Sequence, residues 1–251
     1  MKEWDINIYR GILTGYNDAF IIDGKKKDEL IAADQKSAEI IRPLLRGRDI
    51  KRYSYEYADL YIITTFPSLK INIERYPAIK QHLISYGYDR LKQTGDKGSR
   101  KRTNNQWFET QDSISYWDDF SKQKIVWGNL NLEASYAIAP EGFYVNAPCP
   151  MIVPVNKYLL AVLNSKLADY YIRNLGVTRN GGYFEYKPMF IEKLPVPKVP
   201  KPIEELFMAK VDSILDGNNN TEIEMTINKL VFELYKLSDD EICFIESQCI
   251  Q

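Results

Sequence analysis

Hydrophobic positions divide the chain into a mixed series of short strands and helices. Residues 7–23 alternate and are rich in β-branched and aromatic side chains, which predicts two short strands joined by a turn near Thr14–Asn17. Asp23-Gly24 indicates another turn, and Asp34 is the expected N-cap of a helix through residues 37–45 that ends near Gly47. Similar patterns predict strands within 57–66, 124–130 and 133–153, and helices over 77–86 and 157–172.

The last fifth of the chain has a different pattern. Prolines at positions 195, 197, 200 and 202 predict an extended connector. Beyond it, apolar residues recur at helical spacing, and the capping-box pairs Thr221/Glu224 and Ser238/Glu241 predict a second and a third helix. We therefore predict an α+β (mixed) fold with two parts: a body of residues 1–198 with short curved β-sheets, and a helical tail of residues 199–251.

The composition is that of a globular protein, with 45% hydrophobic and 27% charged residues. No apolar run approaches the ~20 residues needed to span a bilayer, and the start MKEWDINIYR lacks the apolar stretch of a signal peptide. A cytoplasmic protein is expected. Cys149, Cys243 and Cys249 match neither a disulfide framework nor a zinc site, and the single histidine, His82, is expected to be structural.

Charge is distributed unevenly along the chain. The net charge is only −1, but residues 203–251 contain three lysines and eleven acidic residues, a net charge of −8, which leaves +7 on the remainder. A basic body is a weak indication of an anionic partner. Two clusters strengthen it: one surrounds Asp49 and comprises Arg42, Arg46, Arg48, Lys51 and Arg52, and the other surrounds Asp96 and comprises Arg90, Lys92, Lys97, Arg100, Lys101 and Arg102.

The second cluster lies in a long polar segment, DRLKQTGDKGSRKRTNNQW, which predicts a loop. Long loops inside compact domains are often functional. This loop combines cations suited to phosphates with Asn104, Asn105 and Gln106, whose amides can pair with the edge of adenine in the major groove. The alternative is a solvated loop without a role.

Catalytic signatures are missing. The sequence has no Walker-type phosphate loop, no GxGxxG and no GxSxG elbow. Acidic residues such as Glu109, Asp112, Asp118 and Asp119 are scattered as on most protein surfaces. We predict no catalytic and no metal-binding residues, and no cofactor bound by this chain.

Several blocks of sequence, in order, resemble one known family. They are GILTGYNDAFIID (11–23), IIRPLLRGRDIKRY (40–53), ISYWDDFSKQKIVW (114–127), YLLAVLNSKLADYYI (158–172), the GGYFEY to IEKLPVP run ending at Pro197, and INKLVFELYKLSDDEICFIE (227–246). In this combination the chain resembles the TaqI-like specificity domain, the C-terminal target-recognition part of adenine-specific DNA methyltransferases and of type IIG restriction-modification enzymes. The Asn-Pro-Pro-Tyr-like and methyl-donor-binding motifs of such enzymes do not occur here.

The resemblance implies a partner for this chain and a division of labour. A methyltransferase domain, in cis or in trans, would bind S-adenosylmethionine and modify an adenine flipped out of double-stranded DNA. This chain would read the neighbouring base pairs. Phosphate contacts position such a domain, whereas contacts with base edges specify the sequence.

Candidate residues follow for both tasks. For phosphates we expect Arg46, Arg48, Lys51, Arg52, Lys97, Arg100, Lys101 and Arg102; the alternative for the first four is internal ion pairing, for example with Asp49. For bases we expect Asn104, Asn105, Gln106, Arg179, Asn180 and Tyr183, where Gly181 and Gly182 would let the backbone approach DNA; the alternative there is a plain hairpin turn.

Two other functions are compatible with the sequence. The chain could be a fragment of a type I-like specificity subunit, which also binds DNA. It could also be a protein-interaction module in which the acidic tail docks a partner and the basic body is incidental.

Overall fold

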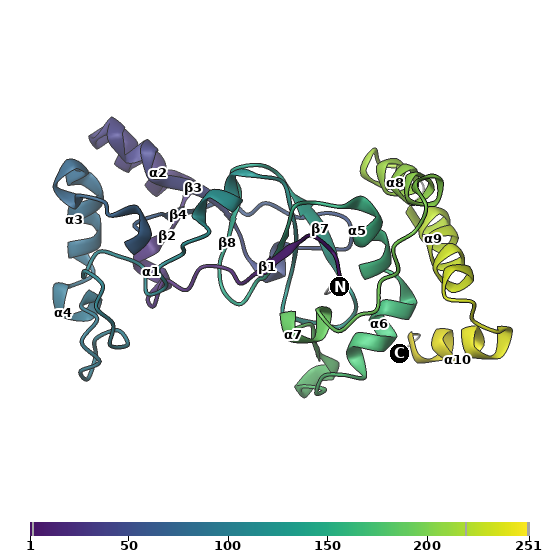
Figure 1. Cartoon of the computed structure of the whole chain (residues 1–251). Coiled ribbons are helices and arrows are strands. Elements are labelled where there is room, and N and C mark those ends of the chain that lie inside the picture. The colour runs from purple at the N-terminus through teal and green to yellow at the C-terminus, as the bar shows by residue number, and fades with distance from the viewer. Residues whose placement is uncertain (2, 219, 250–251) are drawn as a thin grey trace.

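The computed structural model describes residues 1, 3–218 and 220–249, and the chain forms an elongated molecule (Figure 1). The helices within residues 24–91 lie at one end, two β-sheets occupy the middle, and the helices within residues 157–249 form the other end. The α+β prediction is confirmed. None of the described helices is long and apolar enough to cross a membrane.

Two four-stranded sheets and one two-stranded ribbon make up the β-structure. The first sheet is antiparallel, in the order β1 (Asn7–Tyr9), β9 (Met151–Val153), β5 (Lys124–Trp127), β7 (Tyr136–Ala139). The second has the order β2 (Ile21–Asp23), β4 (Leu60–Ile63), β3 (Ile41–Leu45), β8 (Tyr144–Val145), with β3 and β8 parallel. The ribbon pairs β6 (Leu130–Asn131) with β10 (Phe184–Glu185) in antiparallel register.

Strand β5 separates two of the three hydrophobic cores. All four of its residues are buried, and successive side chains point to opposite faces. Ile125 and Trp127 therefore join the core that contains α5 (Lys157–Leu163) and α6 (Lys166–Arg173), whereas Val126 joins the core between the two sheets. The third core packs α2 (Gly24–Ala33) and α3 (Pro77–Ser85) against the second sheet.

The remaining helices are short in the body and long in the tail. They are α1 (Asn17–Phe20), α4 (Tyr88–Leu91), α7 (Pro188–Ile191), α8 (Lys201–Leu215), α9 (Asn220–Leu234) and α10 (Asp239–Cys249). Short 3-10 turns span Gln35–Glu39, Gly47–Asp49, Pro67–Leu69, Ile73–Arg75, Trp117–Ser121 and Asn180–Gly182.

The tail helices pack on the body. Phe207 and Val211 of α8 and Ile227 and Val231 of α9 belong to the same buried core as α5. Helix α8 lies against α5, and α10 lies against α6. The expected division at 198/199 falls in the proline-rich connector. The helices on either side of this connector contribute to one hydrophobic core.

Four local predictions were wrong. Residues 37–45 form a 3-10 turn and strand β3 instead of a helix, because Pro43 cannot donate to a helix and is tolerated where β3 pairs only with β4. The turn at Asp23-Gly24 is instead the start of helix α2, since the Asp23 carboxylate accepts from the Lys26 N–H at 2.7 Å.

The third error concerns residues 157–172, which form two helices. Ser165 caps α6, and the Asn164 side chain pairs with both backbone groups of Tyr136 at 3.0 Å. In the tail, the Ser238/Glu241 capping box is confirmed. The Thr221/Glu224 box is not, because Thr221 lies within α9 and Glu224 pairs with Arg52.

Candidate nucleic-acid interface

A groove of about 620 Å³ brings together two of the regions singled out from the sequence. One wall is the segment from Arg46 to Lys51, and the other is the turn and ribbon strand from Gly128 to Glu133. Tyr183, at the end of the 174–183 loop, also lines it. The backbones cross closely here, because a Cβ placed on Gly47 would lie 3.2 Å from the Gly128 Cα.

Arg46 shapes the first wall. Its guanidinium contacts the Asp49 carboxylate through Nε at 2.9 Å and Nη2 at 2.7 Å, and its backbone N–H donates to the same carboxylate at 2.8 Å. Burial alone would raise the pKa of Asp49, but the hydrogen bonds and charge of Arg46 hold it below its usual value. The internal pairing that the sequence left open is therefore present at Arg46.

Arg48 and Lys51 are exposed on the same wall. Arg48 forms no ion pair within the described part of the chain. Lys51 donates to the Arg48 carbonyl at 3.3 Å and lies 3.8 Å from the Glu56 carboxylate, which is itself largely exposed. These two cations are available to an anion in the groove.

Arg52 is used within the fold. Its guanidinium donates to the Glu224 carboxylate of α9, to the Asn164 carbonyl, and to the Ala134 carbonyl at 3.1 Å. It thus links the segment that follows the groove to a tail helix, and we leave it out of the interface.

The polar loop after α4 is organised around a buried arginine. Arg100 is 2% exposed, and its guanidinium donates to the carbonyls of Leu91, Thr14, Glu109 and Trp107 at 2.7–2.8 Å. Burial lowers its pKa to about 10. Arg100 therefore holds the loop together, and four of its five N–H donors are used within the fold.

The exposed members of this loop surround that anchor. Lys97, Lys101 and Arg102 are exposed and form no ion pair among the described residues. Asn104 and Gln106 are also exposed. The Asn105 amide is committed to the carbonyls of Thr110 and Gln111 at 3.2 and 3.0 Å, so it stabilises the loop rather than facing outward.

The third predicted region is the loop before β10. Arg179 is exposed and forms an ion pair with the buried Glu185, to which Nε donates at 2.7 Å, and Lys187 contacts the other oxygen of Glu185 at 2.7 Å. Lys187 and Arg179 together lower the pKa of Glu185. Asn180 and Tyr183 are exposed, and the Arg179 N–H donates to the Tyr183 carbonyl at 2.7 Å.

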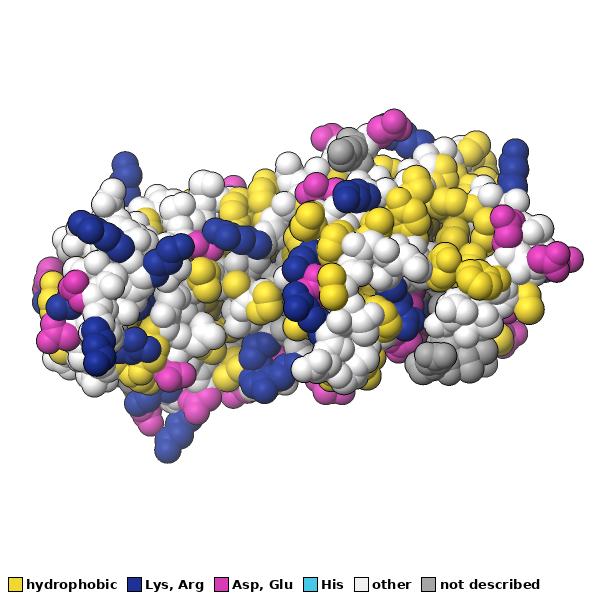
Figure 2. Space-filling view, turned by 90° about the horizontal axis from the view of Figure 1, so that it is seen from below, with side chains coloured by type: hydrophobic (Ala, Val, Ile, Leu, Met, Phe, Trp, Pro, Cys, Tyr) yellow, Lys and Arg dark blue, Asp and Glu magenta, His cyan; other side chains and the backbone are white. Residues whose placement is uncertain are grey.

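Both loops project from one side of the molecule (Figure 1). The loop after α4 and the loop beside α7 extend downward in that view, with the sheets between them. Figure 2 shows that Lys and Arg side chains are spread over this face from the α2–α4 end to the middle, whereas hydrophobic side chains gather over the helical end. The 97–106 loop is thus on the same side of the molecule as the 179–183 loop.

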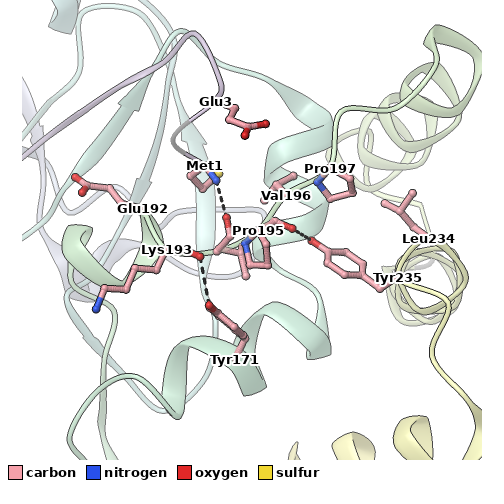
Figure 3. Close-up of a pocket in the computed structure, with 11 residues that line it drawn as sticks. Met1, Glu3, Tyr171, Glu192, Lys193, Pro195, Val196, Pro197, Leu234 and Tyr235 are labelled. Atoms are coloured by element: carbon pink, nitrogen blue, oxygen red, sulfur yellow. Dashed lines mark hydrogen bonds between the residues drawn. The ribbon is translucent and has the colours of Figure 1, made fainter.

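A second hollow, of about 810 Å³, lies where the body meets the tail (Figure 3). Carbonyls of the connector accept from the Met1 amino group at 2.5 Å, from Tyr171 at 3.3 Å and from Tyr235 at 2.8 Å. Because its polar groups serve these contacts, we assign it to the joint between body and tail. The described residues contain no cluster of three or more His, Cys, Asp or Glu side chains that could hold a metal ion.

Sequence reasoning missed Leu130 and Leu132, which line the groove and are 50% and 56% exposed. It also missed Asn129 and Asn131 in the same turn. An exposed leucine in or beside a short strand has the same sequence pattern as a buried one, so no local signal separated these two from the core. The Gly128-Asn129 pair after a buried strand was the one available indication of a turn.

Comparison with known proteins gives matches to a family and to solved structures. No curated protein is significantly similar in sequence. The fold resembles the type IIL restriction-modification enzyme MmeI, solved in complex with DNA (TM-score 0.68, 12% identity, 97% of this chain and 35% of that one). It also resembles the type IIG restriction endonuclease BpuSI (TM-score 0.53, 15% identity, 92% and 30%). The chain spans about a third of the length of either protein.

The sequence match is to the TaqI-like C-terminal specificity domain and covers residues 42–196. It includes the groove, the loop around Arg100, the ribbon and the loop before it. Since the match extends over more than half of the 251 residues, the chain belongs to the TaqI-like C-terminal specificity domain family.

Proposed function

We propose that this chain is the DNA target-recognition module of a restriction-modification enzyme. It holds double-stranded DNA across the face shown in Figure 2 and reads base pairs for a catalytic domain. Membership of a specificity-domain family supports this function, as does the resemblance to MmeI, which was solved in complex with DNA.

The observation that carries the proposal is the arrangement of unpaired cations. Lys97, Lys101 and Arg102 lie on a loop that projects from the same side as the Asn180 loop, and Arg48 lines the groove that the latter loop borders. Cations without acidic partners suit phosphates, because they release the counterions of DNA without first breaking an ion pair.

Two tasks are divided among the predicted residues. Arg48, Lys51, Lys97, Lys101 and Arg102 contact phosphates. Asn104, Gln106, Arg179, Asn180 and Tyr183 face base edges. Arg46, Arg52, Arg100 and Asn105 keep the surrounding backbone in place through the contacts described above.

The catalytic partner supplies the chemistry. We propose that a methyltransferase domain, in the same polypeptide or a separate one, binds S-adenosylmethionine and methylates adenine N6 within or near the sequence read by this chain. Base flipping gives such an enzyme access to a paired adenine.

The test is binding of the purified chain to a randomised duplex library at low and moderate salt, followed by sequencing of the bound fraction. An enriched short motif supports target recognition. Binding that weakens with salt but enriches no motif restricts the chain to backbone contacts. Absence of binding at low salt, with retention of a protein partner, would favour an interaction module instead.

A further inference from the structure

The β6/β10 ribbon carries an apolar surface beside cations. Leu130 and Leu132 are about half exposed and line the groove together with Arg48 and Lys51. An isolated exposed leucine needs no explanation, but two of them at the edge of a basic groove form an apolar contact surface in an otherwise polar site.

Both leucines line the groove beside the ribbon. Leu130 belongs to β6, and Leu132 lies in the bend that follows the strand. Successive side chains of a strand point to opposite faces, so Asn131 points away from the face of Leu130. Asn131 pairs in register with Phe184, whose ring is covered by Arg173 of α6 at 3.8 Å, which places that face toward the body. Leu130 pairs with Glu185, the residue that holds Arg179. The ribbon therefore brings two exposed leucines of the groove near an arginine that is fixed by a buried carboxylate.

The geometry of DNA decides what such a face can contact. The major groove, ~12 Å wide, admits a two-stranded ribbon without distortion of the DNA, whereas the undistorted minor groove is only ~6 Å wide. The apolar group exposed on the floor of the major groove is the C5-methyl of thymine. Leucines gain from leaving water only against an apolar surface.

We propose that Leu130 and Leu132 contact thymine methyl groups in the major groove, with Arg179 beside them. The target sequence then contains at least one A·T pair opposite the ribbon, in a strand orientation fixed by the leucines. This inference rests on the proposed function and adds to it the group that is recognised and the residues that recognise it.

The experiment removes the methyl group and the leucines separately. The motif is first selected with the full chain, and each thymine in it is then replaced in turn by deoxyuridine, which lacks only the methyl. Affinities are measured for the unaltered chain, for Leu130→Ala and Leu132→Ala, and for the control Leu215→Ala, an exposed leucine of α8 at 42% exposure. Because all three leucines are exposed, thermal unfolding is expected to be nearly unchanged.

We expect one or two thymines at which deoxyuridine weakens binding about fourfold, the ratio for one methyl group removed from water. That loss should disappear in Leu130→Ala or Leu132→Ala and persist in Leu215→Ala. If no position responds to deoxyuridine, or if the response is unchanged in both ribbon variants, the inference is wrong while the proposed function stands. Binding without an enriched motif also overturns it, and absence of binding removes both.

Discussion

Arg52 and Glu224 form an ion pair that joins the segment after the groove to tail helix α9. The two residues are 172 positions apart, and both side chains are mostly buried, at 21% and 23% exposure. The same guanidinium satisfies the carbonyls of Ala134 and Asn164. The Arg52 side chain therefore fixes tail helix α9 to the backbone next to Lys51, which lines the groove.

Replacing Arg52 should cost stability. In Arg52→Ala, a largely buried carboxylate and two carbonyls lose their donor, and we expect a loss of about 2–4 kcal/mol in the free energy of unfolding. Urea denaturation measures it. Arg48→Ala is the matched control: it removes an exposed arginine of the same block, and should leave unfolding nearly unchanged while weakening DNA binding. Equal losses of stability in both variants would contradict the assignment.

The three exposed cations of the loop after α4 should set part of the salt dependence of DNA binding. In a Lys97→Ala/Lys101→Ala/Arg102→Ala variant, the slope of log K against log salt should become shallower by about 0.9 for each phosphate that the loop no longer neutralises. The control removes three exposed tail lysines, Lys201, Lys229 and Lys236. A slope that is the same in both variants would exclude the loop from the DNA footprint.

Element types followed from the sequence wherever local patterns and tertiary packing agree. The helices of the tail and α3 are examples, since each has the periodicity of its buried face, and strand β5 is indicated by its short apolar run at 125–127. Residues 37–45 were misassigned because their leucines and isoleucines fit a helix as well as a strand. The pairing with β4 and β8, far away in sequence, decides the outcome.

The candidate site was predictable in residue type but not in the role of each residue. Arg48 and Arg52 are four positions apart in one basic block, yet one faces the groove and the other is bound to α9. Arg100 and Lys101 are adjacent, and only the first is buried. Arg100 and Arg52 are bound by the carbonyls of Thr14 and Asn164, which are distant in sequence. No local sequence pattern shows that these carbonyls lie beside the two arginines.

The two neighbouring asparagines of the loop should behave differently. Asn104→Ala should relax one position of the selected motif, with a loss of about 1–3 kcal/mol against the preferred base if the contact is bidentate. Asn105→Ala removes donors to Thr110 and Gln111, so it should lower stability by about 1 kcal/mol. Library selection and urea unfolding on both variants separate the effects. A uniform loss over all sequences in Asn104→Ala would indicate positioning only.

Arg100 should be needed for the loop to keep its shape. Arg100→Ala removes the guanidinium donor from four backbone carbonyls, of which Glu109 keeps the Gln93 amide and Thr14 keeps the Gln111 N–H, whereas Leu91 and Trp107 lose the side-chain donor described above. We expect a loss of about 3–5 kcal/mol in the free energy of unfolding together with faster tryptic cleavage at Lys97 and Lys101. Arg100→Lys keeps the charge but cannot reproduce the planar fork, so it should rescue only part of the stability. Full rescue by lysine would show that the charge alone matters.

Lys124 gives the chain a stability that depends on pH. Its side chain is fully buried in β5, and Nζ donates to the carbonyls of Phe120, Pro140 and Phe143 at 2.9–3.0 Å. Burial lowers its pKa from 10.5 to about 8. The folded chain therefore loses this proton at a lower pH than the unfolded chain does.

The direction of the effect follows from that order. Between pH 8 and 10.5 unfolding takes up a proton at Lys124, so the free energy of unfolding should increase with pH across this window, by up to about 3 kcal/mol. Other lysines and tyrosines titrate in the same range, so the measured quantity is the difference between the unaltered chain and Lys124→Met in urea denaturation at each pH. The free energy of unfolding of the unaltered chain, relative to that of Lys124→Met, should increase as pH rises above 8. Below pH 8 the difference should be constant, because Lys124 is protonated in both the folded and the unfolded chain. A constant difference throughout would mean that the folded chain holds the Lys124 proton as tightly as the unfolded chain, and that the three carbonyls offset the cost of burying its charge.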